Sequence, residues 1–124
     1  MLKSGTTGGK RGERVVIEVL KQTAVEVEVG TIVDVVVTSP IAIPFELRCQ
    51  WPGAPAIEGG AVRFLGAKVE LPPPDADGGV ATHHYELEAV APGKARVILT
   101  AAAASPEAVC PPRRLDVIVR AGST

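Results

Sequence analysis

Apolar and polar side chains alternate with a period of two residues along most of the chain, which is typical of β-strands with one buried face. The alternation is regular in seven stretches and predicts a strand for each. A further stretch, Ala61 to Leu71, indicates a weaker pair of strands broken near Gly66. The side chains expected to share a core-facing side are Val15, Ile17, Val19, Val25, Val27, Val29, Val33, Val35, Val37, Phe45, Leu47, Cys49, Trp51, Tyr85, Leu87, Ala89, Ala95, Val97, Leu99, Leu115, Val117 and Val119.

Segments rich in proline and glycine separate these strands, and no stretch of about 10 to 12 residues keeps a helical period. The best helical candidate is a single turn with Ser105 as N-cap, Pro106 at the first position and Glu107 near the positive end of the dipole. Short connections favour antiparallel pairing, because parallel strands need long crossovers. The sequence therefore predicts an all-β fold, an immunoglobulin-like antiparallel β-sandwich of seven or eight strands, with a closed barrel as the main alternative.

Composition narrows the kind of core and the kind of partner. The 124 residues suggest one domain, and with 46 % hydrophobic but only 3 % aromatic residues its core must consist of Val, Ile, Leu and Ala. The net charge of −1 argues against a generally basic nucleic-acid binder. Residues 1–14 carry +3 and are expected to form a flexible basic leader, followed by the sandwich over 15–121 and a tail over 122–124.

The sequence contains no run of the roughly 18 apolar residues that a membrane span requires, so we expect no membrane span. Its first residues have no apolar core like that of a signal peptide. Two compartments stay open: a cytoplasmic protein, or an exported protein expressed without its signal.

The order of features from Val15 to Ala121 resembles the chagasin family, small immunoglobulin-like inhibitors of papain-type cysteine proteases. The resemblance is strongest in "PPDADGGVATHHYELEAVAPGKARVILT", from Pro73 to Thr100, which keeps a Pro-Pro-Asp, a Gly-Gly, an aromatic strand and a Gly turn in order. It implies a binding protein rather than an enzyme, with no cofactor, and a papain-like cysteine protease as partner.

The resemblance also implies that three loops at one end of the sandwich enter the protease cleft. The first loop corresponds to Ser39–Phe45, the second to Asp75–Thr82 and the third to Ala101–Pro112. This chain lacks the family's Asn-Pro-Thr-Thr-Gly motif in the first loop and its Arg-Pro-Trp motif in the third. The expected partner-binding residues are Pro40, Ile41, Ala42, Ile43, Pro44, Phe45, Gly78, Gly79, Thr82, Ser105, Pro106 and Glu107.

Two interpretations of Ile41 and Ile43 stay open, because apolar side chains are unusual at the tip of a connecting loop. Stiffened by Pro40 and Pro44, they could form a hydrophobic wedge that loses little entropy on binding. Alternatively they cap the end of the sandwich core. The sequence also allows a different function, a non-inhibitory structural or assembly module that binds a protein partner through an edge strand or through an outer face with Val36 and Ile118.

Other reactive residues carry weaker signals. Cys49 and Cys110 either form a disulfide near the loop end or remain two reduced thiols, and neither has a nucleophile signature. His83 and His84 are neighbours on one strand and so point to opposite faces, which excludes joint chelation of one metal. The segment "DADGG" at 75–79 is interpreted as a polar turn rather than a calcium loop. We therefore expect no metal site and no catalytic residue.

A pair of arginines near the end of the chain is expected to make cross-strand ion pairs. Arg114 and Arg120 should project outward beside Asp116 on the face of the last strand.

Overall fold

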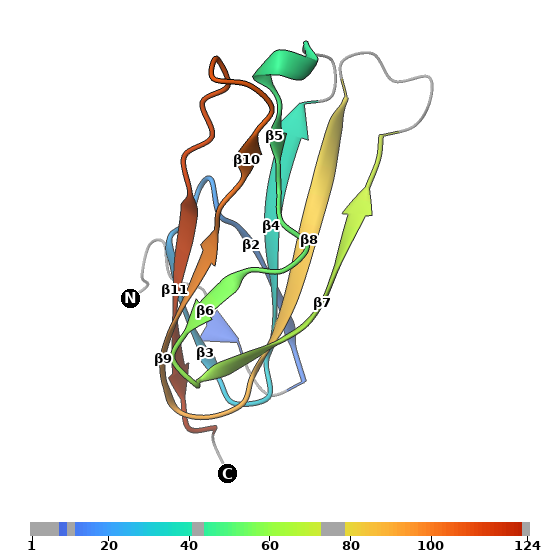
Figure 1. The fold of residues 1–124 in the computed structure, drawn as a ribbon. Helices are drawn as coiled ribbons and strands as arrows, with labels where there is room; N and C mark the ends of the chain where they lie inside the picture. The colour runs from blue at the N-terminus through green and yellow to red at the C-terminus, as the bar shows by residue number, and fades with distance from the viewer. Residues whose placement is uncertain (1–7, 10–11, 41–43, 73–78, 123–124) are drawn as a thin grey trace.

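A computed structural model describes residues 8–9, 12–40, 44–72 and 79–122. Strands packed in two layers make up more than half of this part of the chain (Figure 1). The strands are β1 (Gly8–Gly9), β2 (Arg14–Glu18), β3 (Ala24–Glu28), β4 (Ile32–Pro40), β5 (Cys49–Gln50), β6 (Ala56–Glu58), β7 (Val62–Glu70), β8 (Val80–Ala89), β9 (Gly93–Leu99), β10 (Ala102–Ala103) and β11 (Arg113–Arg120), with one 3-10 turn, η1 (Phe45–Leu47).

Two sheets form the sandwich and a short ladder extends it. The first sheet has the order β1-β3-β11-β9-β6, the second has the order β2-β4-β8-β7, and β10 pairs with β5 separately. This all-β, antiparallel-dominated architecture confirms the predicted fold class. Two residues of the expected leader, Gly8 and Gly9, lie in β1 beside β3.

Parallel pairs occur in both sheets, which simple antiparallel reasoning did not predict. β2 runs parallel to β4, and β3 runs parallel to β11. The reason for the first pair is that the chain passes from β2 in the second sheet to β3 in the first and back to β4. β3 with its two turns therefore acts as the crossover that a parallel pair requires.

Alternation along the long strands produces one core between the sheets. The inward residues of β2, β3, β4, β8, β9 and β11 are buried as predicted. Because Val, Ile, Leu and Ala supply nearly all of this core, the composition predicted its chemistry correctly. The exception is Tyr85, which is almost fully buried and donates its hydroxyl proton to the carbonyl oxygen of Pro52 at 2.6 Å.

Two predicted strand assignments were wrong. Residues 45–51 do not form one strand: Leu47 N–H donates to the Pro44 carbonyl at 2.9 Å and closes η1, which leaves only β5 extended. Proline at the start of such a turn fixes a φ that suits it. The expected strand pair around Gly66 is a single strand, β7, with a register shift between Phe64 and Gly66.

Val36 and Ile118 cannot form one apolar patch, because they belong to different sheets. Val36 lies in β4 of the second sheet and is only 6 % exposed, whereas Ile118 lies in β11 of the first sheet. The outer-face patch that the sequence allowed is therefore absent from the described residues.

Ion pairs on the outer face of the first sheet do form across strands. Arg120 of β11 bonds Glu26 of β3, with 3.0 Å between nitrogen and oxygen. The partner of Asp116 is Arg96 of β9, also at 3.0 Å, because the register places these two residues directly opposite each other.

Candidate functional site

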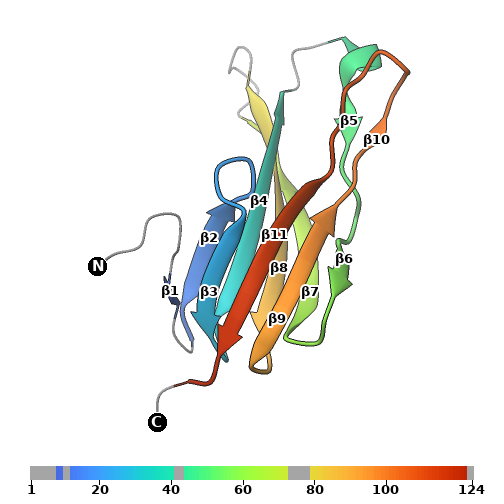
Figure 2. The ribbon, with the colours of Figure 1, turned by 90° about the vertical axis from the view of Figure 1, so that its left-hand side faces the viewer.

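Three connections meet at one end of the sandwich. Figures 1 and 2 show the tip of β4 with η1, the end of β7 with the start of β8, and the β10–β11 connection together at the upper end. The strand register agrees, because Pro40 at the tip of β4 is paired with Val80 at the start of β8. We call this end, formed by Pro40, 44–48, 70–72, 79–80 and 104–112, the loop pole.

A disulfide and a short ladder join the first and third connections of the loop pole. Ala102 and Ala103 of β10 pair with Gln50 and Cys49 of β5. A disulfide links Cys49 to Cys110, with 5.7 Å between their Cα atoms. Of the two states that the sequence left open, the structure therefore contains the bonded one. Two segments far apart in the chain are held as one unit by this link.

Ser105 adds polar contacts to the same unit. Its hydroxyl oxygen lies 2.7 Å from both the Glu46 carbonyl oxygen and the Glu107 carboxylate, so its single proton is donated to one or the other. The Glu107 N–H donates back to this oxygen at 3.3 Å, and the Ala108 N–H donates to the Ser105 carbonyl at 3.1 Å. The predicted single turn, with Ser105 as its cap, is thus present. Hydrogen bonds from Ser105 and from its own N–H lower the pKa of Glu107.

Four of the ten exposed large apolar side chains in the described residues belong to the loop pole. Val109 is 84 % exposed and Leu71 is 73 % exposed, and Leu47 and Val80 are exposed beside them. Scattered apolar residues are normal on a protein surface, whereas a large contiguous apolar patch marks a contact surface. The opposite end has one exposed large apolar side chain among the described residues of the β8–β9 turn, Val90.

A hollow of about 230 Å³ opens between the first and third connections. Leu20, Leu47 and Val109 contribute apolar surface to it. Two other lining residues, Trp51 and Arg113, each have a buried side-chain nitrogen (Nε1 and Nε) without a hydrogen-bond partner in the described part of the chain. The hollow therefore has a partly apolar wall, and the two unpaired nitrogens are buried rather than open to it.

The structure brings most of the predicted partner-binding residues to the loop pole. Pro40 ends β4, Pro44 and Phe45 enter η1, and Gly79 precedes β8. Ser105, Pro106 and Glu107 form the turn of the third connection, and Thr82 lies just inside β8, paired with Thr38. Ile41, Ala42, Ile43 and Gly78 lie outside the described residues. The choice between wedge and cap therefore stays a prediction.

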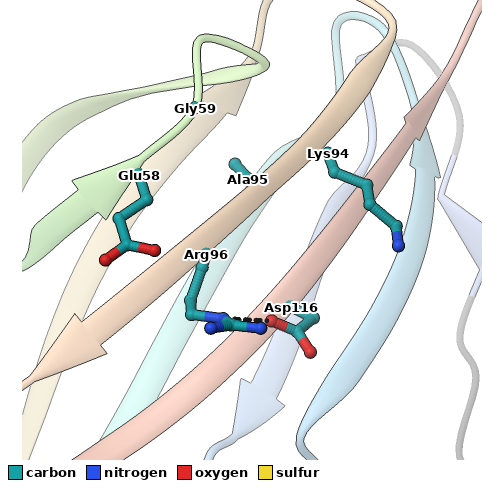
Figure 3. Close-up of a pocket in the computed structure, with 6 residues that line it drawn as sticks. All are labelled: Glu58, Gly59, Lys94, Ala95, Arg96 and Asp116. Atoms are coloured by element: carbon teal, nitrogen blue, oxygen red, sulfur yellow. Dashed lines mark hydrogen bonds and ion pairs between the residues drawn. The ribbon is translucent and has the colours of Figure 1, made fainter.

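A second hollow, of about 360 Å³, lies on the outer face of the first sheet, away from the loop pole (Figure 3). Its charged side chains come from β6, β9 and β11, and Arg96 is already bonded to Asp116. Gly59 at its rim has φ +95°, and a Cβ there would lie 2.5 Å from the Lys94 carbonyl oxygen. We interpret this hollow as the result of a tight β6–β7 turn rather than as a binding site.

The sequence did not reveal a cluster around His84 on the outer face of the second sheet. His84 Nδ1 lies 3.0 Å from Asp34 Oδ2, and its Nε2 lies 2.5 Å from Glu70 Oε1. His83 points to the opposite face, as predicted, with its Nε2 3.3 Å from Ser39 Oγ. Burial lowers the pKa of His83, and the neighbouring His84 lowers it further.

Metal binding and membrane insertion find no support in the described residues. His, Cys, Asp and Glu side chains of residues 8–9, 12–40, 44–72 and 79–122 form no group of three that could hold a metal ion. In the same ranges no helix has the length and apolar content needed to cross a bilayer. Asp75 and Asp77 of the polar turn lie outside the described residues.

Comparison with protein-family models and with curated proteins gives no match. Solved structures similar to the chain include a cysteine protease inhibitor and amebosin. The crystal structure of the cysteine protease inhibitor EhICP2 from Entamoeba histolytica has a TM-score of 0.63, covers 87 % of this chain and 96 % of its own, and is 8 % identical. The chain has the fold of this cysteine protease inhibitor. The solution structure of amebosin has a TM-score of 0.53 and 14 % identity, and covers 87 % of this chain and 97 % of its own.

These neighbours confirm the resemblance to chagasin-type inhibitors at the level of the fold. At 8 % and 14 % identity the likeness concerns the fold alone. Any function has to be argued from the residues of this chain.

Proposed function

We propose that this protein is a binding module that inhibits papain-like cysteine proteases by inserting its loop pole into the substrate cleft. The observation that carries the proposal is the group of exposed apolar side chains at this pole, in a fold shared with a cysteine protease inhibitor. A contact surface at the loop end is where the chagasin-type mode of binding requires one.

Rigidity of the loop pole supports the proposal. An inhibitor must fill a cleft without presenting a cleavable bond in attack geometry, and a preorganised surface loses less entropy on binding. The disulfide, the β5–β10 ladder and the Ser105 contacts hold the first and third connections together before any partner arrives. This chain would thus rigidify its loops with a disulfide, whereas the family relies on its own loop motifs.

The contacts themselves would differ from those of the family. Without Asn-Pro-Thr-Thr-Gly and Arg-Pro-Trp, the affinity would depend on apolar side chains such as Leu71, Val80 and Val109, together with Ile41 and Ile43. Neither cysteine would act as a nucleophile, because the two thiols are bonded to each other. We expect inhibition at sub-micromolar concentration.

Titration of several papain-like proteases with matched variants tests the proposal. Val109→Asp places a charge on the loop pole and Ile43→Asp introduces one in the first loop of the sequence, and each should weaken inhibition at least about tenfold, since burying an unpaired charge is costly. Val90→Asp is the matched control, because Val90 is also apolar and 40 % exposed but lies at the opposite end. Equal potency of all three variants, or no inhibition by the wild type, would contradict the proposal.

The alternative of an assembly module has a weaker basis in the structure. Its outer-face patch is absent, because Val36 is buried and Ile118 belongs to the other sheet. Edge strands with exposed apolar side chains are the remaining candidates in the described residues, for example β7 with Leu65 and Val69 and β2 with Val16. Light scattering over a concentration series distinguishes the two functions, since an assembly module grows in size with concentration and a monomeric inhibitor does not.

A further inference from the structure

His84 lies between two carboxylates that come from different strands. Its Nδ1 faces Asp34 of β4, at 3.0 Å and 3.2 Å from the two carboxylate oxygens, and its Nε2 faces Glu70 of β7 at 2.5 Å. The imidazole is only 14 % exposed and the Asp34 side chain 6 %, whereas the Glu70 side chain is 63 % exposed. We call these three residues the histidine clamp.

The geometry of the clamp fits only one protonation state of the ring. A neutral imidazole has one N–H donor and one acceptor nitrogen, while an imidazolium has two donors. Each ring nitrogen here faces a carboxylate oxygen, and an ionised carboxylate can only accept. Both contacts are therefore hydrogen bonds when His84 is charged, and one of them becomes a repulsive contact between lone pairs when it is neutral.

The charges around the clamp also favour the protonated form of His84. From β2, Arg14 approaches Asp34 at 3.7 Å and also bonds Glu86 of β8. From β7, Lys68 is paired in register with His84. Together with the clamp, three cations oppose three carboxylates when the ring is protonated, and only two cations remain when it is neutral. On the other face of β8, His83 is the remaining titratable neighbour, and a charge on it would oppose the charge on His84.

We propose that His84 is a proton-operated clamp that holds the end of β7 against β8 when it is charged and releases Glu70 when it is neutral. The release is one-sided, because Asp34 is buried in the sheet while Glu70 is exposed and ends an edge strand.

The pKa of His84 is consistent with this clamp. Burial lowers it, but the hydrogen bonds to Asp34 and Glu70 and the charges of both carboxylates outweigh burial and raise the pKa overall.

The position of Glu70 gives the clamp a consequence for the loop pole. Glu70 is the last residue of β7, and the second connection begins directly after it. Protonation of His84 therefore orders the base of this connection. The proposal does not depend on protease inhibition, because it concerns the free protein.

Nuclear magnetic resonance titration of the imidazoles tests the clamp. The chain has two histidines, so the His83→Gln variant leaves the His84 signal alone, and we expect it to titrate above the ordinary value of about 6.5. Adding Glu70→Gln should shift this titration to lower pH, because it removes one of the two charges that stabilise the imidazolium. A His84 titration at or below the ordinary value, or one that Glu70→Gln leaves in place, overturns the proposal.

Amide hydrogen exchange gives a readout at the end of β7. In the wild type, protection of the Glu70 amide, corrected for intrinsic exchange, should fall about threefold as pH rises through the His84 titration, the scale of a partly exposed ion pair. Glu70→Gln should abolish this pH dependence, while His83→Gln should keep it. Protection that is independent of pH in the wild type contradicts the release of β7.

Discussion

Replacing Cys49 and Cys110 with alanine removes the covalent link of the loop pole and should lower the free energy of unfolding by about 4 kcal/mol. The two residues are separated by 61 positions. In the chain-entropy model a link across such a loop removes about 14 cal/mol/K from the unfolded ensemble, which is about 4 kcal/mol at 25 °C. A single domain is stable by about 5–15 kcal/mol, so the variant should still fold but with a much smaller margin.

The loss of stability should appear first at the loop pole. Without the disulfide, β5 and β10 keep two paired positions each, and Ser105 keeps its contacts with Glu46 and Glu107. So few contacts hold a segment weakly, and local opening there should precede global unfolding.

Guanidinium unfolding with and without dithiothreitol measures the effect. The wild type should lose stability on reduction, whereas the double alanine variant should not respond to the reductant. Amide exchange at Ala104, whose N–H donates to the Arg48 carbonyl oxygen, should quicken more than exchange in β4 or β8. A stability loss below about 1 kcal/mol, far under the chain-entropy value, or a reductant effect that persists in the double variant, would refute the reasoning.

Three further predictions concern single positions. Gly59→Ala should lower the free energy of unfolding by about 2 kcal/mol in denaturant unfolding, since φ there is +95° and a Cβ would meet a backbone oxygen of β9. Gly60→Ala, with open space around it, is the control and should be nearly neutral in the same assay. Tyr85→Phe should cost about 1–2 kcal/mol in thermal unfolding, because the buried hydroxyl donates to Pro52, and an unchanged melting temperature would contradict this. The stabilisation from His84 should be complete below the pKa of about 6.5 that it has in the unfolded chain, and it should be lost as pH rises through its raised pKa in the folded protein. His84→Gln should therefore flatten the dependence of unfolding free energy on pH above a pH of about 6.5.

Alternation of apolar residues was sufficient to predict the core and the fold class. The burial of Ile17, Val35 and Val117 follows directly from a period of two, because burial of one face is what selects that period. The prediction failed at 45–51, where the same alternation occurs between Pro44 and Pro52. There the local turn chemistry of proline outweighed the pattern.

The histidine clamp could not be predicted, because it depends on strand register. Asp34, Glu70 and His84 lie apart in the sequence and meet only because β8 pairs with β4 on one side and β7 on the other. Composition and spacing do not determine that register. The loop pole was predicted through family resemblance, and its disulfide was left open because the usual immunoglobulin pair links other strands.

The place of β11 in the first sheet has a consequence for biosynthesis. β11 lies between β3 and β9 and joins the two halves of that sheet in the described part of the chain. β3 and β9 therefore each have one unpaired edge until β11 has left the ribosome. Nascent chains that stall before Arg113 would expose the unpaired edges of β3 and β9, so the long-range pairing of this sheet is completed only after residues 113–120 have been synthesised.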